Sequence, residues 1–163
     1  IMIYEINISV KNLNETKYLA KVFSLKLKIP FFLSLKGKIG TGKTTFASFF
    51  INHISKEKIK VLSPTFPIIN IYKLKKVEIW HYDLYRIKDP KEFFTLDFDV
   101  ALNHCVLVEW PEIMEEFFPK NRVEIIFKDD EKDLRNLKIC FLGCNANYYE
   151  EIWKHLKKKF SIY

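Results

Sequence analysis

The most distinctive residues of the chain form a glycine-rich segment, GKIGTGKTT, at positions 37–45. Its spacing fits the pattern G-x-x-x-x-G-K-[ST], in which glycines allow the backbone to turn its N–H groups inward onto phosphate oxygens. The chain has four glycines, and three of them lie in this segment. An apolar run, FFLSL, precedes the segment and helical spacing follows it, as the pattern requires. The segment therefore predicts a phosphate-binding loop.

The side chains of this loop have separate expected tasks around a nucleoside triphosphate. Lys43 would reach the β- and γ-phosphates, Thr44 would bind Mg²⁺, and Thr45 would contact the α-phosphate. The helix that begins near Lys43 would add the partial positive charge of its N-terminus. We expect ATP with Mg²⁺ as the ligand and Lys43 as a catalytic residue. The expected ATP-binding residues of the loop are Gly37, Lys38, Ile39, Gly40, Thr41, Gly42, Lys43, Thr44 and Thr45.

Two acidic residues are candidates for the partner that such a loop needs to hold or orient Mg²⁺. Asp83 ends the segment VEIWHYD and Glu109 ends CVLVE, so both lie where strand ends meet the ligand crevice of an open α/β sheet. We expect both to act in catalysis and metal binding, and the sequence leaves open which is the more direct ligand. Thr65 lies in a turn, SPTF, where a hydroxyl could sense the γ-phosphate, although a purely structural turn is the alternative.

Strand and helix patterns alternate around these residues. Expected strands cover residues 4–10, 31–35, 59–62, 68–74, 77–84 and 105–110, and an expected β-hairpin joins 122–128 to 133–142 through the polar segment DDEKD. Expected helices cover residues 15–28 with a cap at Asn14, the segment after Lys43, 90–103 and 146–160. The predicted fold is a single α/β domain over residues 1–163 of the P-loop NTPase type. It has a mixed, largely parallel sheet flanked by helices and an antiparallel C-terminal hairpin.

Composition favours a globular cytoplasmic protein. Apolar residues make up 48% of the 163 residues, with no uncharged apolar run of about eighteen that would predict a membrane span, and the first residues lack the pattern of a secretory signal. The net charge is +7, but 24 of the 27 basic residues are lysines, which favours a solvated surface over a dedicated RNA groove. Cys140 and Cys144 lack a second Cys/His pair for zinc, so core packing is expected for them.

Four segments, GKIGTGKTTF, SPTF, HYDLYRIKDP and VEWPE, occur in this order along the chain. Their order and spacing resemble those of the TsaE (YjeE) family, and the similarity spans residues 14 to about 136. The resemblance implies a small ATPase that acts with the proteins TsaB and TsaD in the threonylcarbamoylation of adenosine 37 in ANN-decoding tRNAs. It further implies slow hydrolysis without partners and contact with tRNA only indirectly, through TsaD.

The resemblance also implies roles for single residues. Thr44 and Glu109 would hold Mg²⁺, Asp83 would support hydrolysis, and Thr65 would be a switch-like threonine. Three further residues would lie at or near the nucleotide: Trp110, Arg135 and Thr16. The sequence departs from the family pattern at four positions: Lys38, Pro67, Asn70 and Asp97. The first three put the rate and the coupling to partners in doubt without removing a phosphate ligand.

Three other functions share some of these features. A small-molecule kinase would use the same loop but would need an acceptor pocket and usually an arginine-bearing lid, for which only Arg86 and Arg122 are available. A GTPase would need the NKxD and D-x-x-G motifs, which do not occur. An RNA-binding module would need exposed stacking aromatics, whereas these aromatics lie mostly in apolar runs. His81 in HYDLYR is expected to be a core residue outside the catalytic set.

Overall fold

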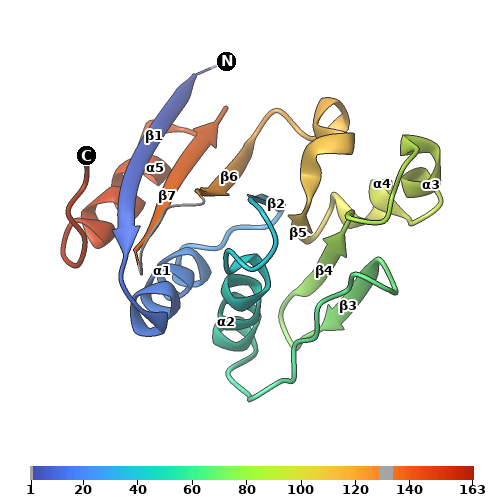
Figure 1. The fold of residues 1–163 in the computed structure, drawn as a ribbon, viewed down its shortest axis with the longest axis horizontal. Coiled ribbons are helices and arrows are strands. Elements are labelled where there is room, and N and C mark those ends of the chain that lie inside the picture. Colours follow the sequence, from blue (N-terminus) through green and yellow to red (C-terminus); the bar gives the residue numbers. More distant parts are fainter. Residues whose placement is uncertain (1, 129–133) are drawn as a thin grey trace.

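A seven-stranded sheet with helices on both faces organises the chain (Figure 1). The structure is a computed structural model, and it describes residues 2–128 and 134–163. The elements are β1 (Ile3–Val10), α1 (Leu13–Leu25), β2 (Phe31–Lys36), α2 (Lys43–Ser55), β3 (Ile69–Lys73), β4 (Glu78–Asp83), α3 (Pro90–Phe94), α4 (Phe98–Ala101), β5 (Cys105–Glu109), the 3-10 helix η1 (Pro111–Phe117), β6 (Arg122–Phe127), β7 (Arg135–Leu142) and α5 (Ala146–Leu156).

The strands lie in the order β1-β7-β6-β2-β5-β4-β3. The central strands β6, β2, β5 and β4 are parallel, and β1, β7 and β3 extend the sheet through antiparallel pairings. The predicted mixed α/β fold is confirmed. The predicted C-terminal hairpin is confirmed in its two strands, since β6 and β7 pair antiparallel, while the segment DDEKD lies outside the described residues.

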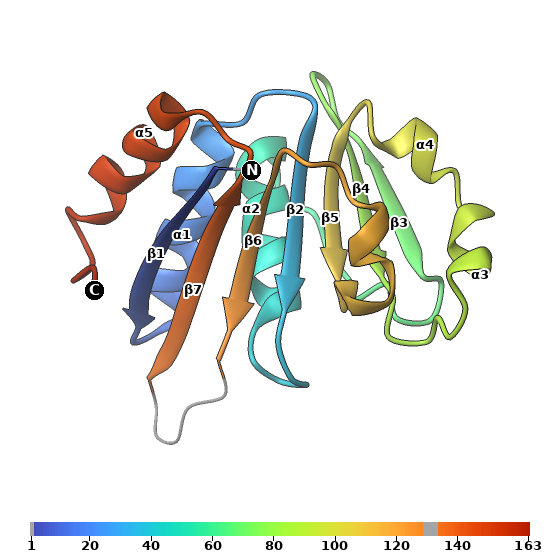
Figure 2. The same ribbon diagram turned by 90° about the horizontal axis from the view of Figure 1, so that it is seen from above.

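Two apolar clusters enclose the sheet, one on each face. The helices α1, α2 and α5 cover one face, where Phe23 and Phe46 pack among the inward residues of the strands (Figure 2). The short elements α3, α4 and η1 cover part of the other face, where Tyr82 packs against Phe93 and Phe98. Successive side chains of a strand point to opposite faces, and both faces are buried here, so the central strands are nearly continuous apolar runs.

Several local predictions were wrong, each for a visible reason. The first helix is capped by Asn12 and not by Asn14, because the Asn12 side chain accepts the N–H of Glu15 at 3.0 Å. Residues 59–62 do not form a strand, since the side chain of Asn52 on α2 bonds both backbone groups of Ile59, at 2.7 and 3.1 Å. The expected helix at 90–103 is divided into α3 and α4 by Asp97, which has the left-handed φ of 52°.

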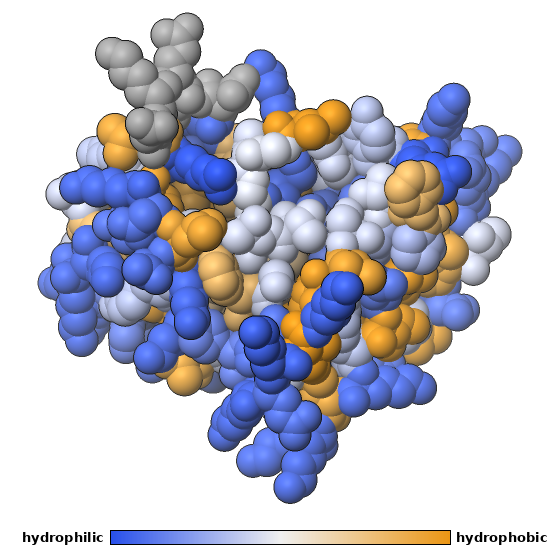
Figure 3. All heavy atoms as spheres, turned by 60° about the horizontal axis from the view of Figure 1, so that its bottom comes forward, coloured by the Kyte–Doolittle hydropathy of each residue, from blue (hydrophilic) through white to orange (hydrophobic). Residues whose placement is uncertain are grey.

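Hydrophilic side chains cover much of the face shown in Figure 3, and smaller hydrophobic patches lie between them. The exposed apolar side chains include Ile39 in the glycine loop, at 74% exposure, and Phe66 in the SPTF turn, at 81%. None of the helices in the described part of the chain combines the length and the apolar character that crossing a bilayer requires.

Candidate nucleotide-binding site

The glycine loop connects the carboxyl end of β2 to the N-terminus of α2. Gly42 precedes the helix with a left-handed φ of 107°, and a Cβ at this position would collide with the guanidinium of Arg135. No side chain caps α2, and no acidic residue lies in its first turn. The backbone N–H groups and the partial positive charge at this helix end are therefore available to an anion.

Lys43 is the first residue of α2, and its side chain turns back over the loop. Its Nζ donates to the carbonyl oxygens of Gly37 and Lys38, at 2.5 and 2.7 Å, and lies 4.1 Å from the centre of the Trp110 ring. The residue is only 4% exposed. Burial lowers the pKa of Lys43, and the nearby Glu109 carboxylate partly opposes that effect. The loop thus holds an ammonium group beside the N-terminus of α2, where phosphates bind in loops of this kind.

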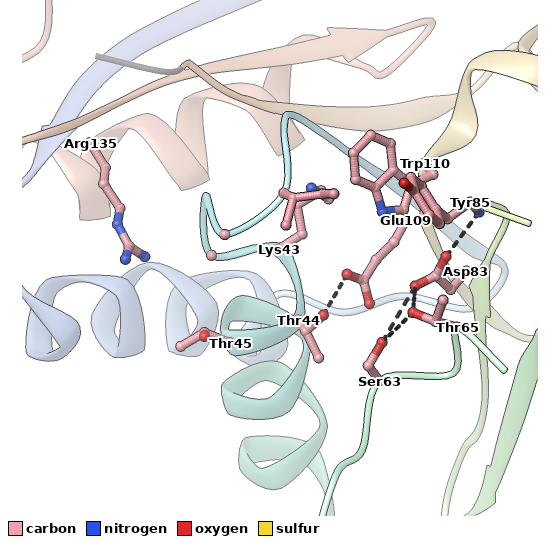
Figure 4. A pocket seen from close by; sticks show the side chains of 13 residues that line it. Lys43, Thr44, Thr45, Ser63, Thr65, Asp83, Tyr85, Glu109, Trp110 and Arg135 are labelled. Carbon is pink, nitrogen blue, oxygen red and sulfur yellow. Dashed lines mark hydrogen bonds between the residues drawn. The ribbon is translucent and has the colours of Figure 1, made fainter. Parts of the chain in front are cut away.

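Glu109 ends β5 and faces the loop. Its Oε1 accepts a hydrogen bond from the hydroxyl of Thr44 at 2.7 Å, and the residue is 1% exposed (Figure 4). The strand pairing sets Asp83 directly beside Glu109 at the end of β4, yet the hydrogen bond of Thr44 goes to Glu109. A threonine hydroxyl and a carboxylate oxygen, both hard ligands, meet at the mouth of the loop.

Asp83 is engaged instead by the SPTF turn. Its Oδ2 accepts from the hydroxyl of Thr65 at 2.6 Å and from that of Ser63 at 3.4 Å (Figure 4). Its Oδ1 accepts the backbone N–H of Tyr85 at 2.9 Å. Asp83 is 2% exposed, so these bonds satisfy a buried carboxylate and fix the turn beside the loop.

Replacing Thr65 by valine should loosen this turn, because it removes the short bond to Asp83 while keeping the shape of the side chain. We expect opening of the turn to become easier by about 1–2 kcal/mol. Hydrogen exchange of the backbone amides of Ser63, Thr65 and Phe66 measures this change. Ser63→Ala is the matched control and should have a smaller effect, since the Ser63 hydroxyl lies farther from Asp83. Equal exchange in wild type and Thr65→Val would contradict the assignment.

These groups line one open pocket of about 370 Å³. Trp110 closes part of it in a left-handed backbone conformation, with φ at 55°, and its ring lies 4.9 Å from that of Tyr85. The lining residues are Ile39, Gly40, Gly42, Lys43, Thr44, Thr45, Ser63, Thr65, Asp83, Tyr85, Glu109, Trp110 and Arg135. Phosphate-binding backbone, two cationic side chains, two carboxylates and two aromatic rings thus converge at one edge of the sheet.

Comparison with known proteins places this arrangement in a family. A family model described as threonylcarbamoyl adenosine biosynthesis protein TsaE matches residues 10–137. The chain belongs to the TsaE family. It therefore has a role in tRNA threonylcarbamoyladenosine biosynthesis, and the resemblance noted in the sequence is confirmed.

Individual TsaE proteins match over most of their length. The Bacillus subtilis protein named tRNA threonylcarbamoyladenosine biosynthesis protein TsaE is 34% identical over 151 residues, or 93% of each chain. The protein of the same name from Rickettsia prowazekii is 41% identical over 123 residues, which are 74% of this chain and 85% of that protein. The crystal structure of Bacillus subtilis YdiB superposes with a TM-score of 0.71 and 28% identity over 97% of each chain.

The structure brings most of the predicted site residues of this TsaE chain together. Gly37, Lys38 and Thr41 belong to the same loop without lining the pocket. Thr16 lies apart from the lining: it is buried on α1, and its hydroxyl bonds the carbonyl oxygen of Asn12 at 3.5 Å. Its role at the nucleotide stays a prediction.

Three residues at the site were not predicted from the sequence. Ser63 and Tyr85 line the pocket. His81 lies buried on β4, and its ring contacts the Glu109 carboxylate. Ser63 lies in SPTF, and the other two lie in HYDLYR, so the TsaE motifs themselves were the signal that could have found them.

Proposed function

We propose that this TsaE chain binds ATP with Mg²⁺ and hydrolyses it as the ATPase subunit of threonylcarbamoylation of adenosine 37 in ANN-decoding tRNAs. The contact between Thr44 and Glu109, 2.7 Å long at the mouth of the glycine loop, carries the proposal. Phosphoryl transfer on P-loops needs a hydroxyl and a strand-end acid together beside the phosphates.

The donor set fits Mg²⁺. This ion keeps several waters and binds through one or two carboxylates together with substrate phosphates, so an open site with few protein ligands suits it. Thr44 and Glu109 provide such a site, and within residues 2–128 and 134–163 no cluster of three His, Cys, Asp or Glu side chains competes for a metal. When bound, Mg²⁺ would neutralise charge on the β- and γ-phosphates.

The other side chains have tasks that follow from their contacts. The free N–H groups at the start of α2 hold the phosphates. Lys43 exchanges the two loop carbonyls for phosphate oxygens, which a buried ammonium prefers because they carry full charge. Asp83 holds Thr65 and the SPTF turn beside the γ-phosphate, where the turn orients water.

Hydrolysis by the isolated chain is expected to be slow. Positioning and charge neutralisation are the main terms in phosphoryl transfer, and Lys43 and Arg135 are the cations that line the pocket among the described residues. The pocket is open to solvent beside the exposed Phe66 and Tyr85. We propose that TsaB and TsaD complete the site, and that tRNA contact is made through TsaD.

The fate of the γ-phosphate tests the reaction type. With γ-labelled ATP and Mg²⁺, the label should appear as inorganic phosphate, because water is the acceptor. Addition of small-molecule extracts should not divert it. Transfer of the label to an organic acceptor would instead make the protein a kinase.

A further inference from the structure

His81 is a buried residue of β4 whose ring contacts the Glu109 carboxylate. Its Nε2 lies 2.7 Å from Glu109 Oε2, and its side chain has no exposed surface. The other oxygen of Glu109 binds the Thr44 hydroxyl. The three side chains thus form a connected series from the interior of the sheet to the loop. We propose that His81 is a positioning residue that orients Glu109 toward Thr44 and Mg²⁺, a role that rests on the proposed function.

The register between β4 and β5 places His81 within reach of Glu109. His81 pairs with Leu107 of β5, so Glu109 lies one step diagonally ahead on the same face of the sheet. Ile79 and Leu107 on that face belong to the apolar cluster beneath α2. The imidazole therefore approaches Glu109 from the dry interior, while Thr44 approaches it from the loop. The Oε2 atom of Glu109 thus contacts His81, and its Oε1 atom contacts Thr44.

The unpartnered ring nitrogen identifies the donor. His81 Nδ1 is buried without a hydrogen-bond partner among the described residues. A proton on Nδ1 would be a buried N–H without an acceptor, whereas Nε2 faces a carboxylate, which only accepts. Of the two tautomers, the arrangement therefore fits the one with the proton on Nε2. His81 donates one fixed bond to the inner oxygen of Glu109, as outer partners of metal ligands commonly do.

This bond has a consequence for metal binding. Without it, the inner oxygen of a nearly fully buried carboxylate loses its partner, and the carboxylate is free to rotate away from Thr44. Loss of an outer partner typically weakens metal binding about 10- to 100-fold. A residue that only filled space in the core would instead affect folding and all nucleotide binding alike.

Two amide replacements distinguish a residue that positions Glu109 from one that only fills space in the core. His81→Gln places its Nε2 where the imidazole Nε2 lies and can still donate to Glu109. His81→Asn is shorter, with its amide near the position of Nδ1, and cannot reach. Binding of a non-hydrolysable ATP analogue is measured by calorimetry with Mg²⁺ and with EDTA, and thermal unfolding is measured without nucleotide. The readout is the affinity for the ATP analogue with Mg²⁺ divided by its affinity with EDTA.

The wild-type ratio should be kept within about threefold in His81→Gln and should fall about tenfold or more in His81→Asn, with the EDTA affinity unchanged in both. Equal ratios in the three proteins, or equal losses in both variants, would overturn the role of His81 and leave the proposed function intact. Absence of any nucleotide binding by the wild type would overturn both.

A measurement on the wild-type protein covers the case in which His81→Asn does not fold. Long-range ¹H–¹⁵N correlation spectra distinguish the two neutral tautomers of histidine. We expect the proton of His81 on Nε2, in a resonance that shifts when Glu109 is replaced by glutamine. A proton on Nδ1 would overturn the assignment.

Discussion

Replacing Lys43 by methionine is expected to lower the rate of ATP hydrolysis by about 100-fold or more, the loss typical for removal of a preorganised charge from a transition state. Methionine keeps the apolar stem over Trp110 and removes only the ammonium that the loop holds. Initial rates of phosphate release at saturating Mg²⁺ measure the effect. Lys60→Met, on the exposed surface, is the matched control and should retain the wild-type rate.

The same replacement should not destabilise the nucleotide-free protein. Burial lowers the pKa of Lys43, so the charge of this side chain opposes folding. That opposition is fully present at pH values below the lowered pKa and disappears as the pH rises to the ordinary value of 10.5. At neutral pH the melting temperature of Lys43→Met should therefore equal or exceed that of wild type. A melting temperature that falls together with activity would show that Lys43 acts through folding.

Replacing Glu109 by glutamine is expected to reduce hydrolysis by about 100- to 1000-fold while the fold is retained. Glutamine has the same shape, and its amide oxygen can accept from His81 while its NH2 group donates to the Thr44 hydroxyl, so the negative charge and one acceptor are lost. Phosphate release across a Mg²⁺ titration measures the change, and higher Mg²⁺ should recover little activity. Glu116→Gln makes the same chemical change on an exposed residue and should leave the rate unchanged. Wild-type rates in Glu109→Gln would remove this residue from the metal site.

The glycine loop was predictable because its information is local. The spacing from Gly37 to Thr44 and the flanking strand and helix are adjacent in the sequence, and the structure places them as expected. The ends of the strands at Asp83 and Glu109 were also readable, since each apolar run stops at an acid. The parallel central sheet then brings these ends to the loop.

The different contacts of Glu109 and Asp83 were not predictable from the sequence. They depend on the side chain of Thr44 reaching Glu109 and on the SPTF turn folding back onto Asp83, contacts that join residues 65 and 18 positions apart. The role of His81 was missed for the same reason. Its expected burial is confirmed, but its partner across the sheet follows only from the pairing of β4 with β5.

Two predictions of secondary structure, the strand at 59–62 and the unbroken helix at 90–103, were wrong because of single residues. The run at 59–62 has the apolar, β-branched composition of a strand, but Asn52 bonds the backbone of Ile59. Asp97 takes a left-handed conformation, which ends the expected helix between α3 and α4.

The proposed function is ATP hydrolysis by the glycine loop and Glu109 for tRNA modification, together with partner proteins. The most direct measurement is ATP hydrolysis by the purified chain, alone and with the matching TsaB and TsaD proteins, beside Lys43→Met and Glu109→Gln. We expect slow hydrolysis alone, a clear increase with both partners, and loss of that increase in both variants. Rapid hydrolysis that is indifferent to the partners, or that survives in either variant, would contradict the account.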